Sequence, residues 1–167
     1  GVNLSDIAAM AGRPKFAVVS LGLSRRHPSS LAEELFAGMQ SIAREFETAI
    51  IGGDTNSWSG PLVVNVTLMG EPIGSRAVAR SGAQVGDWIM VTGELGGSLL
   101  GRQFQFTPRV HEAAALHSLV ELHAMLDISD GLVGDLYHLL EQSQCGAVLK
   151  ANRIPISPDA HRMSGPQ

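Results

Sequence analysis

Two aspartates stand three residues apart in the segment LDISDGLVGDL, which covers residues 126–136. Asp127 follows an apolar stretch, and Asp130 stands before a glycine and a pattern typical of a helix. Two interpretations fit these residue types. Ser129 or Asp130 could cap the helix by accepting hydrogen bonds from its first free N–H groups. Alternatively, Asp127 and Asp130 could bind a metal ion, because an unpaired charge beside a buried backbone is costly.

Two further acids occupy similar places in the sequence. Asp6 is expected where a loop enters a helix, and Asp54 follows Gly52 and Gly53 at the expected end of a strand. Oxygen ligands from separate segments suit Mg²⁺ when it also bridges phosphates, and glycine lets backbone N–H groups approach a phosphate closely. A helix cap or a turn explains each acid taken singly better than a metal does. The acids taken together favour a metal site without deciding it.

Other catalytic or phosphate-binding motifs are disfavoured by their spacing. His111 and His117 stand six residues apart, whereas two zinc ligands on one helical face need a spacing of about four. The glycine-rich segment GELGGSLLG lacks the lysine of a P-loop. Arg80 is a candidate phosphate contact, although a solvated charge in a linker is the better explanation from the residues alone.

The composition argues against several classes of function. The chain has 167 residues, of which 44% are hydrophobic, and this is enough for a packed core. Sixteen acidic residues outnumber twelve basic ones, so a nucleic-acid partner is not expected. Cys145 is the single cysteine, which excludes an intrachain disulfide and favours a cytoplasmic location. No apolar run approaches the roughly 18 residues of a membrane span, so no membrane partner is expected.

The apolar periodicity predicts an α/β fold in which helices and strands alternate. The segment over 71–86 is rich in Gly, Ser and Pro and is expected to connect two domains, 1–75 and 76–167. Helices are expected over 4–11, 30–46, 108–120 and 132–143. Strands are expected over 13–23, from 47 to the GGDT at 52–55, and over 61–70, 87–93, 123–129 and 146–150. The strand over 61–70 is apolar on both faces, which predicts that it is covered on both sides.

The chain resembles the thiamine-monophosphate kinase family of the aminoimidazole-ribotide synthetase-like superfamily. The likeness runs from Val2 to about Met163 and rests on five segments in the same order: VNLSDIAAMAGRPKFAVVSLGL, IGGDT, RSGAQVGDWIMVTGELG, FTPRV and DISDGLVGDLYHLLEQSQCGA. It implies a two-domain α/β (α+β) fold in which both domains are incomplete. The family's N-terminal pair of aspartates and its C-terminal substrate-binding motif are expected to lie outside these residues. Trp58 and the loop over 24–30 have no assigned role.

The resemblance also implies an activity and the residues that serve it. The activity is the Mg²⁺-dependent phosphorylation of thiamine monophosphate to thiamine diphosphate by ATP, through direct in-line transfer in a homodimer. The implied Mg²⁺ ligands are Asp6, Asp54, Asp127 and Asp130, and the implied ATP contacts are Phe36, Gly53, Arg80 and Ser129. Phosphoryl transfer depends on positioning and charge neutralisation, which metal ions can supply in a chain with few lysines.

Two alternative functions stay open at this point. A relative of the hydrogenase-maturation type would bind nucleotide in a maturation or scaffold role. A degenerate domain would keep the acids only as helix caps. The retention of all four aspartates favours the kinase.

Overall fold

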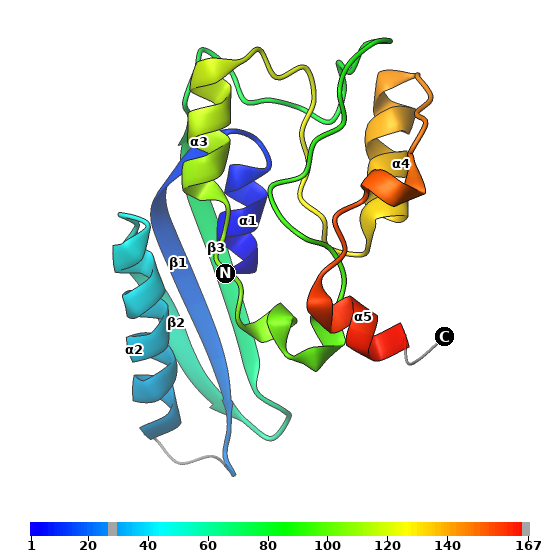
Figure 1. Cartoon of the computed structure of the whole chain (residues 1–167). Coiled ribbons are helices and arrows are strands. Elements are labelled where there is room, and N and C mark those ends of the chain that lie inside the picture. The colour runs from blue at the N-terminus through cyan, green and yellow to red at the C-terminus, as the bar shows by residue number, and fades with distance from the viewer. Residues whose placement is uncertain (27–29, 165–167) are drawn as a thin grey trace.

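A three-stranded sheet forms the centre of the computed structural model, which describes residues 1–26 and 30–164. The strand order is β2-β1-β3. The central strand β1 (Gly12–Ser24) runs parallel to β2 (Ala49–Trp58) and antiparallel to β3 (Val63–Pro72). A parallel neighbour needs a crossover connection, and α2 (Ser30–Glu45) supplies it beside β2 (Figure 1).

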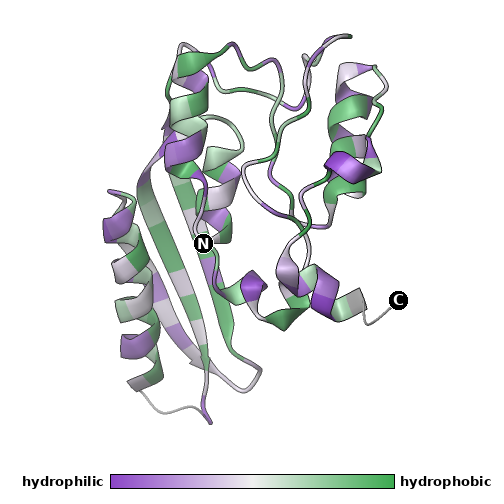
Figure 2. Ribbon diagram, in the orientation of Figure 1, coloured by the Kyte–Doolittle hydropathy of each residue, from purple (hydrophilic) through white to green (hydrophobic). Residues whose placement is uncertain are grey.

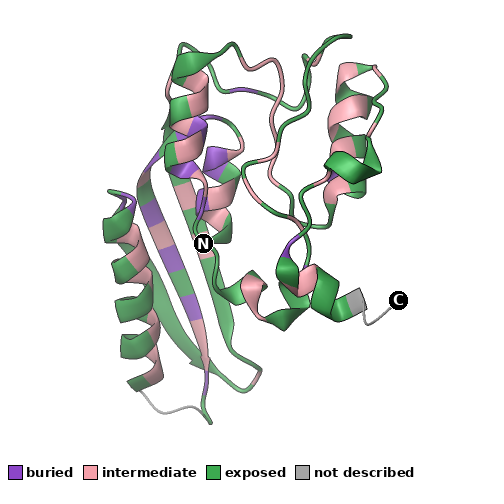
Figure 3. Ribbon diagram, viewed as in Figure 1, coloured by how far each residue is buried: buried purple, intermediate pink, exposed green. Residues whose placement is uncertain are grey.

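The core lies where α1 (Val2–Ala8) and α3 (Val110–Leu119) meet each other and the sheet. Its buried members are Leu4, Ala8, Phe46, Val110 and Ala113, which come from three separate segments. Figure 3 shows the buried residues gathered along β1 and around α1 and α3, whereas α2 and α4 (Leu132–Ser143) are largely exposed. No helix within the described ranges is long and apolar enough to cross a bilayer.

The four helices predicted from the sequence are confirmed at α1, α2, α3 and α4. The helix α4 has the predicted bounds, and the ends of the other three differ by up to three residues. The structure adds α5 (Pro158–Ser164) and three short 3₁₀ helices, Ser98–Leu100, Arg102–Phe104 and Ala151–Arg153. Residues 27–29, part of the loop to which the sequence assigns no role, lie outside the described residues.

Two expectations about the sheet are wrong. The strand that was expected to end at GGDT continues to Trp58, because its second half pairs in parallel register with Val18–Ser24 of β1. The expected cover on both faces of 61–70 is also wrong. Val63, Val64 and Met69 are 43–45% exposed, because a sheet face is covered only where a helix packs on it, and α1 covers only part of β3.

The strands predicted over 87–93, 123–129 and 146–150 are wrong as well. Among the described residues these segments have no ladder partner, and Trp88, Met90 and Val148 are 73–86% exposed. Figure 2 shows hydrophobic residues along the irregular segments that lie in space between α3 and α4. An apolar run forms a strand only where another strand offers its N–H and C=O groups, and periodicity does not reveal whether one does.

Candidate functional site

Asp6 lies inside α1, whose N-cap is Gly1, so the cap interpretation of Asp6 is wrong. Burial raises the pKa of the Asp6 carboxyl, the negative charge of Asp127 raises it further, and the positive charge of Arg80 lowers it. Asp127 and Arg80 therefore both lie within electrostatic reach of Asp6, although the three residues come from distant segments. Two carboxylates that repel each other beside an arginine form an arrangement that a cation would stabilise.

Asp127 is held in place by two hydroxyl groups. The Ser5 hydroxyl donates to Oδ2 of Asp127 at 3.0 Å, and the Ser129 hydroxyl donates to the same oxygen at 3.1 Å. The bond from Ser5 joins residues 122 positions apart in the sequence. The fold thus places the VNLSD and DISDG segments side by side.

Asp135 organises the turn that carries Ser129 and Asp130. Its Oδ2 accepts backbone N–H bonds from Ser129, Asp130 and Gly131 at 2.9, 3.0 and 3.0 Å, and the residue is only 7% exposed. Gly131 is the N-cap of α4, and no side-chain cap bond is present there. The expected cap by Ser129 or Asp130 is therefore wrong, and the bonding runs in the opposite direction, from the turn to an acid inside the helix.

Sequence reasoning missed Asp135. Asp135 lies in the first turn of α4, in the segment GDL at residues 134–136. Acidic residues are common in the first turn of exposed helices too, because they complement the helix dipole. Only burial distinguishes the two cases.

The structure does not join Asp54, Gly53 or Phe36 to the Asp6 and Asp127 pair by any hydrogen bond or ion pair within the described residues. Asp54 lies in β2, opposite Ser20 of β1, and accepts a hydrogen bond from the Asn56 amide at 2.6 Å. Phe36 lies on α2 and is 46% exposed.

Gly53 has a structural reason of its own to be glycine. A Cβ built on it would lie 1.8 Å from the carbonyl oxygen of Val19 on β1. A side chain at residue 53 would therefore disrupt the pairing of β1 with β2, whether or not a nucleotide also approaches this backbone.

The four aspartates do not form a complete metal site by themselves. Among residues 1–26 and 30–164, no three His, Cys, Asp or Glu side chains lie close enough to hold a metal ion. Mg²⁺ keeps several waters and is usually held by one or two carboxylates together with substrate phosphates. The pair Asp6 and Asp127 fits that donor set.

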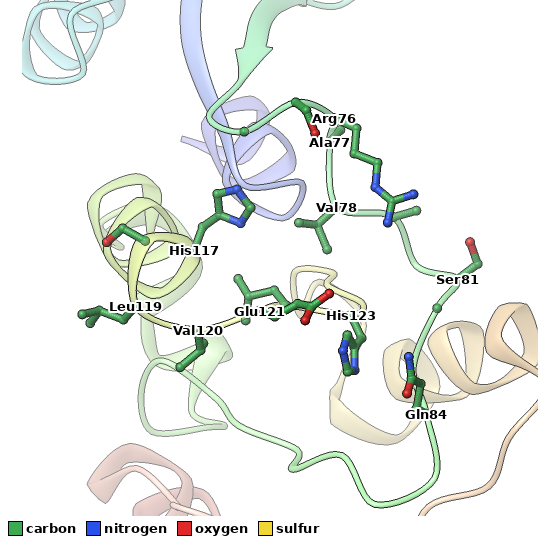
Figure 4. Close-up of a pocket in the computed structure, with 16 residues that line it drawn as sticks. Arg76, Ala77, Val78, Ser81, Gln84, His117, Leu119, Val120, Glu121 and His123 are labelled. Atoms are coloured by element: carbon green, nitrogen blue, oxygen red, sulfur yellow. The ribbon is translucent and has the colours of Figure 1, made fainter.

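A separate cavity of about 1070 Å³ lies between the segments 74–84 and 117–123 (Figure 4). Its polar side chains are Ser75, Arg76, Ser81, Gln84, His117, Ser118, Glu121 and His123. Arg80 is not among the lining residues, although Ala79 and Ser81 are. None of the eight site residues expected from the resemblance lines this cavity.

His123, which lines the cavity, forms an ion pair with Asp87 in a neighbouring loop. Nδ1 of His123 lies 2.9 Å from Oδ2 of Asp87, and this hydrogen bond raises the pKa of His123. The pKa of Asp87 is lowered, first by the backbone N–H of Gln84 and then by His123. The range of pH over which both residues are charged is therefore wider than it would be without this contact.

Comparisons with known proteins show which sequences and folds this chain resembles. The family described as AIR synthase related protein, N-terminal domain, matches residues 1–71. The thiamine-monophosphate kinase of Rhodopirellula baltica is 42% identical over 163 residues, which are 98% of this chain and 51% of that protein. The structure described as AaThiL complexed with AMPPCP and TMP superimposes with a TM-score of 0.88 at 27% identity, over 100% of this chain and 60% of that one.

Further structures extend the comparison. A thiamine-monophosphate kinase from Stenotrophomonas maltophilia superimposes with a TM-score of 0.84 at 34% identity, over 98% of this chain and 58% of that one. The hydrogenase maturation protein HypE shares the fold, with a TM-score of 0.82 at 20% identity over 96% of this chain and 56% of that one. The similarity to HypE concerns the fold alone.

The first part of the chain, residues 1–71, matches the AIR synthase related N-terminal domain, and the chain has the mixed α/β fold expected from its sequence. Over nearly its whole length it is similar to thiamine-monophosphate kinases. It spans about half the length of the relatives that it matches.

Proposed function

We propose that the full-length protein containing this chain transfers the γ-phosphoryl group of ATP to thiamine monophosphate and forms thiamine diphosphate. The observation that carries the proposal is the juxtaposition of Asp6, Asp127 and Arg80 from three distant segments. The names of the relatives and the ligands of the AaThiL structure support the choice of reaction.

In this proposal the protein uses several Mg²⁺ ions: Asp6 and Asp127 hold one of them, and Asp54 and Asp130 would each contribute a ligand to the others. Mg²⁺, when bound, neutralises the charge of the phosphates. The chain's own residues position the reactants. The hydroxyls of Ser5 and Ser129 fix the orientation of the Asp127 carboxylate.

The implied nucleotide contacts are Phe36, Gly53, Arg80 and Ser129. Arg80 would bind a phosphate of ATP, since a guanidinium presents several N–H donors to a phosphate at once. Transfer is direct and in line, because the described residues offer positioning and charge and phosphoryl transfer needs little else from a protein. A phosphorylated protein intermediate trapped during turnover would contradict direct transfer.

The decisive experiment measures thiamine diphosphate formed by the full-length protein from thiamine monophosphate and ATP, with and without a chelator. We expect turnover only with Mg²⁺ and expect calorimetry to show ATP binding weakened at least about tenfold by the chelator, since two carboxylates would otherwise face the phosphates. Equal affinity for ATP with and without chelator would contradict metal binding by the aspartates. ATP binding without any thiamine diphosphate would favour the maturation or scaffold role instead.

We further propose a homodimer formed through residues 1–75. The edge strand β3 exposes Val63, Val64 and Met69, and an exposed apolar edge is normally covered by a partner. Light scattering of the full-length protein at micromolar concentration should give twice the mass of one chain, and a monomer would contradict this.

The division into domains 1–75 and 76–167 and a cytoplasmic location are also proposals. The family match that ends at residue 71 supports the first, and limited proteolysis should cut first within 71–86. The single Cys145 and the use of ATP support the second. Cell fractionation that found the protein outside the cytoplasm would contradict it.

A further inference from the structure

The backbone that carries Arg80 is held on both sides by hydrogen bonds. The carbonyl of Ala79 accepts the N–H of Met125 at 3.0 Å, and Met125 stands two residues before Asp127. The carbonyl of Arg80 itself accepts the hydroxyl of Ser143 at 3.0 Å. The position of Arg80 relative to Asp127 therefore depends on one bond to the segment that carries Asp127 and on one bond to α4.

Ser143 makes two further bonds to the same loop. Its oxygen accepts the N–H groups of Gly82 and Ala83 at 3.2 and 3.1 Å. A hydroxyl has one donor and two acceptor sites, so these three bonds use its full capacity. The loop cannot shift without breaking more than one of them.

Gly82 shows how closely this loop approaches the following segment. Its φ is +122°, and a Cβ on it would lie 2.6 Å from the carbonyl oxygen of His123. Glycine is needed both for this backbone conformation and for the close approach. The loop over 80–83 is thus enclosed between the end of α4 and the segment that leads to Asp127.

The two ends of α4 contact two different parts of the candidate site. Asp135, near the start of the helix, accepts three N–H bonds from the turn over 129–131, and Ser143, the last helical residue, binds the loop over 80–83. Eight residues separate them, which is about 12 Å along a helix. The helix sets the distance between the DISDG turn and the loop of Arg80.

We propose that Ser143 is a positioning residue that holds the Arg80 loop so that the guanidinium stays within electrostatic reach of Asp6. This inference rests on one part of the proposed function, the binding of ATP by Arg80, because correct positioning of Arg80 matters only if Arg80 binds ATP. Ser143 acts through Arg80 and does not itself touch the nucleotide.

The first test compares Ser143→Ala, Ser143→Thr and Ser118→Ala in the full-length protein. Ser143→Ala should raise KM for ATP about fivefold and change kcat less than about twofold, since the loss of a hydrogen-bonding hydroxyl weakens binding by roughly that factor. Ser143→Thr keeps the hydroxyl and should restore KM. Ser118→Ala is the matched control, because the Ser118 hydroxyl bonds only within its own helix, to the carbonyl of Ala115, among the described residues.

The second test asks whether the effect passes through Arg80. In an Arg80→Ala background, Ser143→Ala should have no further effect on KM for ATP, because coupled residues are not additive. The Nε–Hε resonance of Arg80, followed by NMR without ATP, should shift in Ser143→Ala and stay unchanged in Ser118→Ala.

The outcomes separate this inference from the proposed function. An unchanged KM and an unchanged Arg80 resonance in Ser143→Ala would overturn the positioning role while leaving the kinase in place. A KM raised equally with and without Arg80 would also overturn it. If the wild-type protein showed no ATP-dependent turnover, the proposed function would fall, and the Arg80 resonance would still decide the positioning role.

Discussion

Asp127→Asn is expected to lower kcat/KM for thiamine diphosphate formation by at least about a hundredfold, because metal ligation contributes several kcal/mol to transition-state stabilisation. Asparagine keeps an oxygen that can accept the hydroxyls of Ser5 and Ser129, so the main change is the loss of one negative charge. The measurement is a steady-state assay of the full-length variant at saturating Mg²⁺. Glu141→Gln, an exposed acid on α4, is the matched control and should keep full activity.

The same variant should not lose stability in the absence of metal. The charge of Asp127 raises the pKa of Asp6, which means that the two carboxylates repel each other when both are ionised. A melting curve recorded with chelator should therefore show a Tm equal to or above that of the wild type. Activity within about threefold of the wild type would exclude Asp127 from the metal site, and a clearly lower Tm would show that its role is structural.

Asp135→Ala should destabilise the protein by about 3 kcal/mol, because three backbone N–H groups lose a charged acceptor in a buried place. All three bonds reach the same oxygen of Asp135. Asp135→Asn can present one carbonyl oxygen there and should cost roughly half as much. The measurement is denaturant unfolding of the full-length variants without metal or nucleotide.

Glu141→Ala lies on the same helix as Asp135 and is exposed, so it is the control for changes on α4 in general. It should change stability by less than about 0.5 kcal/mol. If Asp135→Ala had an effect as small as this control, the turn over 129–131 would be held by other contacts and the organising role of Asp135 would be wrong.

The local pattern of the sequence was enough to predict α1, α2, α3 and α4, although it did not predict α5. In α2 the apolar residues recur every three or four positions and polar residues fill the other face, and this depends on helix geometry alone. The resemblance of VNLSD and DISDGL likewise led to Asp6 and Asp127, which the structure brings within electrostatic reach of each other. Both signals are local, because they need only residue types at fixed spacing.

The extent of each strand depends on which other strand pairs with it, and a local sequence pattern does not reveal that partner. Residues 49–58 became β2 along their whole length because β1 pairs with them. Residues 87–93 are as apolar as many strands, but they have no ladder partner among the described residues. Hydrogen bonds between strands join residues that are distant in the sequence, so the extent of each strand was decided by tertiary structure.

Contacts between distant residues also explain why some of the residues discussed above were predicted from the sequence and others were missed. Asp6 and Asp127 were identified from the sequence by itself, because their types and neighbours resemble those of a known family. The roles of Asp135 and Ser143 come from burial and from bonds to backbone groups, some of them 63 positions away in the sequence. An aspartate or a serine on a helix looks the same in the sequence whether its side chain faces solvent or a loop. For Asp135 and Ser143, the position of α4 against the rest of the chain decided that both side chains bind loops.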